Sequence, residues 1–96
     1  MASNFRISFH RESEILYLNL TGDFDGSSAF ELLNVLKKKI TGTYKIIIHT
    51  AFLKDVHHFG VETFRRHFSE LNGHQLSIIF TGKHAAQIAP GKWLFV

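Results

Sequence analysis

The chain of 96 residues contains no cysteine. This absence excludes disulfides, thiolate metal ligands and a cysteine nucleophile together, and it is compatible with a reducing compartment. No apolar run approaches the ~20 residues that a membrane-spanning helix needs. The first residues also lack the basic and then apolar arrangement of a signal peptide. We therefore expect a cytoplasmic protein without a membrane span.

The chain also lacks a strong charge of either sign, because its formal net charge is only +3 with histidines neutral. Two basic runs, 37–39 and 65–67, each lie opposite an apolar stripe of a predicted helix, as polar residues on a solvated helix face usually do. The first run also occupies a last helical turn, where cations are stabilised by the helix dipole. We therefore rank nucleic acid well below protein as a partner.

Apolar residues are abundant instead, at 45% of the chain with ten phenylalanines. Strict alternation predicts two strands joined as an antiparallel hairpin, and short β-branched runs predict further, buried strands. Helical spacing predicts two main helices and one short helix. The predicted strands cover 5–10, 15–20, 44–50 and 75–80. The predicted helices cover 27–40, 59–71 and 85–88, and 93–96 is expected to be a last strand or a strip packed on the core.

These elements predict one α/β domain over residues 1–96, in the order β-β-α-β-α-β-α-(β). Strands separated by helices require parallel crossovers, and the N-terminal hairpin adds an antiparallel edge, so the sheet should be mixed and mostly parallel. Residues 21–26 and 51–58 are expected to be loops. Ser28 with Glu31 matches a capping box for the first helix.

Polar residues before the first helix admit two interpretations. Asp23 and Asp25, together with Ser27 and Ser28, could form an acid–base or metal-binding cluster. Turn chemistry and helix capping explain each residue type without a substrate, so we favour that account.

Two segments carry a family resemblance. The first is Leu20-Thr21-Gly22-Asp23-Phe24-Asp25, which precedes a Leu-rich helix, and the second is Lys45-Ile46-Ile47-Ile48, which leads to a loop and Gly60. In this order over roughly 5–88, the chain resembles the STAS domain of anti-sigma-factor antagonists. The resemblance implies a non-enzymatic module of a bacterial signalling system that regulates transcription by binding a protein. Its partner would be an anti-sigma or kinase-like regulator, or another signalling protein. The family's fourth helix is expected to be absent, and pairing of 93–96 with a second copy could protect the exposed sheet edge.

The chain departs from the family at the switch. Family switches have aspartate–serine–serine–glycine at this helix start, and a kinase phosphorylates the second serine. Aligned on Gly60, this chain has His57, His58 and Phe59 there, and Phe59 has no hydroxyl. We therefore expect no phosphorylation at this position but a retained protein-binding face along 52–64. The expected partner-binding residues are Phe52, Asp55, His57, His58, Phe59, Gly60, Glu62 and Thr63.

Two alternatives use the same region differently. His49, His57 and His58 could together hold zinc, and the protein would then be a metal-assisted enzyme. We rank this alternative last, because the side chains of adjacent histidines diverge and the spacing does not make them converge. We expect no cofactor. A small-ligand or lipid-handling domain would instead need an apolar pocket. Whether Phe52, Phe59, Trp93 and Phe95 fill the core or anchor an interface stays open.

Overall fold

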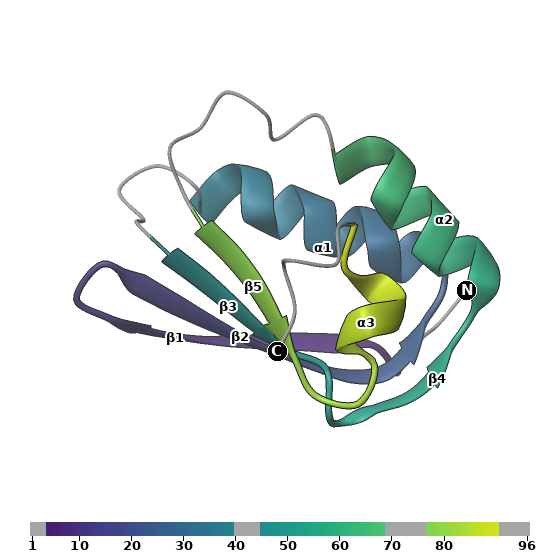
Figure 1. Ribbon diagram of the computed structural model, residues 1–96, viewed down its shortest axis with the longest axis horizontal. Helices are drawn as coiled ribbons and strands as arrows, with labels where there is room; N and C mark the ends of the chain where they lie inside the picture. Colours follow the sequence, from purple (N-terminus) through teal and green to yellow (C-terminus); the bar gives the residue numbers. More distant parts are fainter. Residues whose placement is uncertain (1–3, 40–44, 69–76, 91–96) are drawn as a thin grey trace.

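In the part of the chain that the structure describes, a mixed five-stranded sheet carries three helices (Figure 1). The computed structural model describes residues 4–39, 45–68 and 77–90. Their elements are β1 (Arg6–Glu12), β2 (Ile15–Phe24), α1 (Gly26–Lys39), β3 (Lys45–His49), β4 (Leu53–Val56), α2 (His58–His67), β5 (Ser77–Thr81) and α3 (Ala85–Ile88). The α/β class and the element types predicted over these residues are confirmed, with one added strand.

The sheet has the predicted pairing. Its strand order is β1-β2-β3-β5, and β4 also pairs with β2. β1 and β2 form the antiparallel hairpin, whereas β2–β3, β2–β4 and β3–β5 are parallel. Helices α1 and α2 lie side by side over the same face of the sheet (Figure 1). This arrangement follows from right-handed crossovers, which return each helix to that face.

The core lies between the sheet and these two helices. Alternate strand residues point into it, including Leu16, Leu18, Leu20, Ile46, Ile48, Ile78 and Phe80. The predicted apolar stripes are buried as expected at Ala29, Leu32, Leu33, Leu36, Val61 and Phe64. Phe64 is central, because its ring makes edge contacts with Phe24 at 6.3 Å and Phe80 at 5.9 Å between centroids. Burial of each such side chain contributes about 1.5–3 kcal/mol.

Two predicted loops prove to contain strand. β2 continues through Gly22 to Phe24, and residues 53–56 form β4 alongside it. The register shifts between Gly22 and Asp23, where Gly22 has a φ of +88° and a Cβ would collide with the Asn4 backbone. Only glycine suits that bulge. β3 therefore pairs with the first half of β2 and β4 with its last residues.

The predicted capping box is wrong, because Asp25 rather than Ser28 caps α1. Asp25 Oδ1 accepts hydrogen bonds from Ser28 N at 2.9 Å and Ser27 Oγ at 2.9 Å. Ser28 Oγ lies 3.0 Å from the same oxygen and 2.8 Å from Asp23 O, either of which can accept its proton. A carboxylate one residue before the helix satisfies more donors than the hydroxyl two residues inside it. Helix capping, which we favoured over an acid–base or metal-binding cluster for this segment, is thereby confirmed for Asp25.

Some predictions concern residues outside the described ranges. They are the helix ends at Gly42 and Asn72–Gly73, the stripe residues Ile40 and Leu71, and the segment 93–96 with Trp93 and Phe95. Within the described part of the chain, the helices are too short or too polar to cross a bilayer.

Candidate functional site

The site is built where β3 ends, because Thr50 fixes the chain at that point. Thr50 is fully buried. Its backbone N–H and its hydroxyl both donate to Thr81 O, at 2.8 and 2.7 Å, and the hydroxyl accepts from His84 N at 3.2 Å. Leu53 N donates back to Thr50 O at 3.1 Å. The end of β3, the end of β5 and the start of α3 are therefore tied together by one side chain.

The short loop between β3 and β4 projects an aromatic side chain into solvent. Phe52 is 69% exposed, whereas Leu53 directly after it is buried. Because Thr50 and Leu53 fix both sides of the loop, Phe52 is held at the surface by ordered backbone. Phe52 therefore presents an apolar ring to solvent on backbone that is already fixed.

The first turn of α2 projects a second aromatic side chain. His57 N donates to Phe24 O at 2.9 Å, and His57 makes no side-chain cap for the helix. Gly60 is buried against the α1 cap, since a Cβ there would lie 2.7 Å from Asp25 C and O. Phe59 is 71% exposed, and its ring edge lies over Gly26, 2.8 Å from where a Cβ would be. Glycine at two positions thus brings α2 close to α1 and sets Phe59 at the surface.

The Asp25 carboxylate, which lies where α2 approaches α1, is strongly ionised. Burial alone would raise the pKa of Asp25, but the hydrogen bonds from the Ser28 amide and from the Ser27 and Ser28 hydroxyls lower it from 3.8 to about 2. A negative charge at the start of α1 is also favoured by the helix dipole. The loop beneath Phe59 and Gly60 therefore stays charged at neutral pH.

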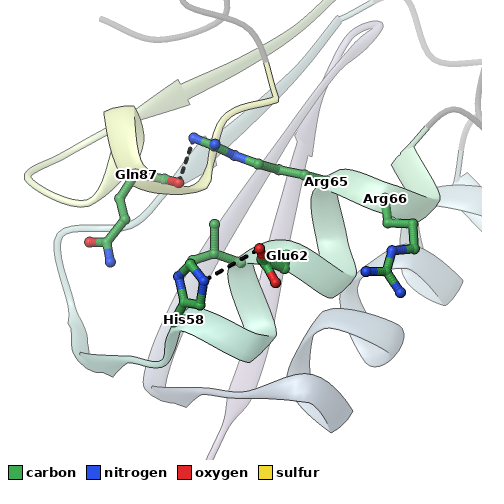
Figure 2. Close-up of a pocket in the computed structure, with 6 residues that line it drawn as sticks. His58, Glu62, Arg65, Arg66 and Gln87 are labelled. Atoms are coloured by element: carbon green, nitrogen blue, oxygen red, sulfur yellow. Dashed lines mark hydrogen bonds and ion pairs between the residues drawn. The ribbon is translucent and has the colours of Figure 1, made fainter.

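A shallow, open groove of about 450 Å³ lies between α2 and α3 (Figure 2). It is lined by His58, Val61, Glu62, Arg65, Arg66 and Gln87. Arg65 Nη2 donates to Gln87 O at 2.8 Å and holds α3 against α2. His58 Nε2 lies 3.3 Å from Glu62 Oε2, one turn along the helix. Val61 is the one apolar side chain among these lining residues, beside charged and polar ones.

The predicted partner-binding residues separate into two groups. The exposed residues are Phe52, Asp55, His57, His58, Phe59 and Glu62, whereas Gly60 and Thr63 are buried. The two buried residues can only position the others. The groove residues Arg65, Arg66 and Gln87 were not predicted as part of the site. The helical spacing of 58, 61, 62 and 65 indicates their shared face, but the packing of α3 against it is not visible in the sequence.

The three candidate metal ligands do not form a chelating set. His49 Nδ1 lies 2.6 Å from Thr81 Oγ1, and the His49 ring is parallel to Tyr17 at 6.3 Å between centroids. His58 faces Glu62 instead. Over residues 4–39, 45–68 and 77–90, no three histidine, aspartate or glutamate side chains are grouped so that they could hold a metal ion.

Comparison with known proteins identifies the fold. No protein-family model and no curated protein sequence matches the chain. The anti-sigma factor antagonist SpoIIAA, in its unphosphorylated form, is similar with a TM-score of 0.59 and 18% identity over 80% of this chain and 71% of that one. A DUF3478-family protein from Shewanella loihica PV-4, described as having a SpoIIAA-like fold, is similar with a TM-score of 0.60 and 15% identity over 100% of this chain and 90% of that one. The STAS-like fold predicted from the sequence is confirmed.

Proposed function

We propose that this chain is a non-enzymatic regulatory module that binds another protein through its loop–helix face. We define this face by Phe52, Asp55, His57, His58, Phe59 and Glu62. The observation that carries the proposal is the exposure of Phe52 and Phe59, at 69% and 71%, on backbone that buried neighbours hold in place. Aromatic anchors of this kind dominate the energetics of protein interfaces.

The supporting backbone makes such binding inexpensive in entropy. Thr50 fixes the loop before Phe52, and Gly60 fixes the first turn of α2 against Asp25. A partner that covers either ring therefore orders little that is not already ordered. Covering one exposed phenylalanine fully would contribute about 1.5–3 kcal/mol.

The fold supports a regulatory role of this kind. SpoIIAA, which shares the fold, is an anti-sigma factor antagonist whose structure is known in an unphosphorylated form. In the family that the sequence resembles, the switch serine corresponds to Phe59 here. Because phenylalanine carries no hydroxyl, we propose that binding at this face is not switched by phosphorylation of that residue. The partner would be an anti-sigma or kinase-like regulator, or another signalling protein, in the bacterial cytoplasm.

An affinity capture from cells of the source organism tests the proposal. The immobilised baits are the wild-type chain, the double variant Phe52→Ala with Phe59→Ala, and the control Phe9→Ala. Phe9 is 48% exposed on β1 and lies outside the loop–helix face. Wild type and control should retain the same protein in stoichiometric amounts, and the double variant should lose it. Equal retention by all three baits would contradict the proposal.

A further inference from the structure

β1 forms one outer edge of the sheet. It ends the strand order β1-β2-β3-β5, so none of the described strands pairs with its outer side (Figure 1). All residues of β1 are exposed except Ile7, which is half-buried. An exposed strand edge presents backbone N–H and C=O groups with which a further strand can pair. Proteins commonly block such an edge with proline, lysine or a bulge, and β1 contains none of the three.

The hairpin register decides which residues of β1 face outward. Glu12 pairs with Ile15 across a two-residue turn, and the closing pair of such a turn exchanges both backbone hydrogen bonds. Hydrogen-bonded and non-hydrogen-bonded pairs alternate along an antiparallel ladder, so Ile7, Phe9 and Arg11 direct their N–H and C=O groups away from β2. These three positions therefore have the geometry to pair with another strand.

β1 is complementary to itself when two copies run antiparallel. A two-fold axis through Phe9, its middle residue, sets Arg6 of one copy opposite Glu12 of the second copy. Ile7 then faces Arg11, so the three outward positions meet those of the second copy as hydrogen-bonded pairs. Opposite charges at directly facing positions of a sheet stabilise the pairing. Backbone geometry and side-chain charge therefore favour the same register.

The charged ends of β1 also have contacts within their own chain. Arg6 Nη1 donates to Phe5 O at 2.9 Å, which is compatible with an ion pair because a guanidinium carries five N–H donors. Glu12 Oε1 lies 3.8 Å from His10 Nε2, and both side chains are 68% exposed. That contact is an ion pair only when His10 is protonated. With His10 neutral, the Glu12 carboxylate can face the arginine of a second copy.

The helix-bearing face of β1 contributes both for and against pairing. Phe9 is 48% exposed on this face, and Lys39 Nζ at the end of α1 lies 4.7 Å from the centroid of its ring. At the axis the two Phe9 rings would cover each other, which favours association. The Lys39 ammoniums and the Arg11 side chains of the two copies would repel one another across the axis, which opposes it. We therefore expect a reversible association and not a permanent dimer.

We propose that two copies of this chain pair through β1, with Phe9 on the two-fold axis, and so join their sheets. The contact is isologous and closes after two copies. An extended peptide of another protein could pair with the same edge, but the charge match of β1 with itself favours a second copy. The inference goes beyond the proposed function, because no residue of β1 belongs to the loop–helix face. The dimer would present that face twice, so a partner with two binding sites would be held more tightly.

Exchange of the two charges tests the register. Arg6→Glu and Glu12→Arg each replace two opposite-charge pairs of the dimer with two like-charge pairs, so each should weaken dimerisation about tenfold. The double variant, Arg6→Glu with Glu12→Arg, restores opposite charges and should dimerise like wild type. The two positions are ~20 Å apart along one strand, so only a second copy can produce this rescue. An equimolar mixture of the two single variants should likewise form a heterodimer, which native mass spectrometry identifies.

Sedimentation velocity over a concentration series measures the association, and thermal unfolding followed by circular dichroism shows that each variant is folded. Wild type should dimerise with a Kd on the order of 10–100 μM, because one strand pair is a small interface. Phe9→Ala should weaken the dimer about tenfold, whereas Phe30→Ala, with nearly the same exposure on α1, should leave it unchanged.

Three results would overturn the inference. They are a wild-type chain that stays monomeric at about 1 mM, association that grows beyond the dimer, and a double charge variant that dimerises no better than the single ones. A dimer with the same affinity in every variant would place the contact elsewhere and overturn it as well. None of these results bears on capture of a partner through Phe52 and Phe59, so this inference and the proposed function fail separately.

Discussion

The Asp25 carboxylate should stabilise the protein by an amount that depends on pH. Its Oδ1 accepts from the Ser28 amide and from two serine hydroxyls, all within 2.9–3.0 Å. These hydrogen bonds favour the charged form more than burial disfavours it, which lowers the pKa of Asp25 from 3.8 to about 2. We therefore expect Asp25→Ala to destabilise the folded state at neutral pH, and Asp25→Asn to do so less, because the amide oxygen still accepts hydrogen bonds.

The magnitude follows from that pKa. At ~1.4 kcal/mol for each pH unit, a lowering from 3.8 to about 2 bounds the contribution at ~2.5 kcal/mol. Asp25 is partly exposed, so solvent screening reduces this, and the expected loss for Asp25→Ala is about 1–2 kcal/mol. Because the folded pKa is the lower one, the contribution is complete well above pH 3.8 and is lost as the pH falls toward 2. It should fall to about half by pH 3.

Urea unfolding followed by circular dichroism measures this effect. The difference in unfolding free energy between wild type and Asp25→Ala is compared at pH 7, 5 and 3. Asp55→Asn, an exposed carboxylate on β4, serves as the control and should change stability little at any of these values. A wild-type advantage over Asp25→Ala that stays constant from pH 7 to pH 3, or that is absent at pH 7, would refute this account of the cap.

Two further substitutions test the supports of the site. Gly60→Ala should lower the unfolding free energy by about 1–2 kcal/mol, because its Cβ would lie 2.7 Å from the Asp25 backbone, and this crowding outweighs the better helix propensity of alanine; an unchanged or higher melting temperature would contradict it. Thr50→Val keeps the side-chain shape but removes the hydrogen bonds to Thr81 O and from His84 N. It should therefore lower the unfolding free energy by about 1–3 kcal/mol and speed amide exchange in α3. Unaltered amide exchange in α3 would show that Thr50 does not hold this helix.

Periodicity in the sequence was sufficient to predict the elements that bury a continuous face. The alternation along 15–20 and the helical stripe from Ala29 to Leu36 are local patterns, and their burial follows directly from them. The β4 strand has no such pattern. Leu53-Lys54-Asp55-Val56 is short and half charged, and it becomes a strand only because the end of β2 offers a free edge beside it. Gly22 and Asp23 likewise resemble a turn by composition and are strand by tertiary pairing.

The sequence places the candidate surface, but it does not show which of its side chains are exposed. The position of the surface at 52–64 followed from the end of the central strand. Sequence alone could not decide whether Phe52 and Phe59 are core or surface, because the same residue type serves both and only the packing around Leu53 and Gly60 separates them. The aromatic contact of Phe30 with α2 was also invisible, since it joins helices that are far apart in the chain.

The central claim is that a protein partner binds through Phe59 on preformed backbone. Isothermal titration of the captured partner with the wild-type chain and with Phe59→Ala tests it most directly, since this side chain is exposed and its removal leaves the core intact. The account predicts a one-to-one complex with wild type and at least about tenfold weaker binding for Phe59→Ala at unchanged thermal stability. Equal affinity of the two proteins for the partner would contradict it.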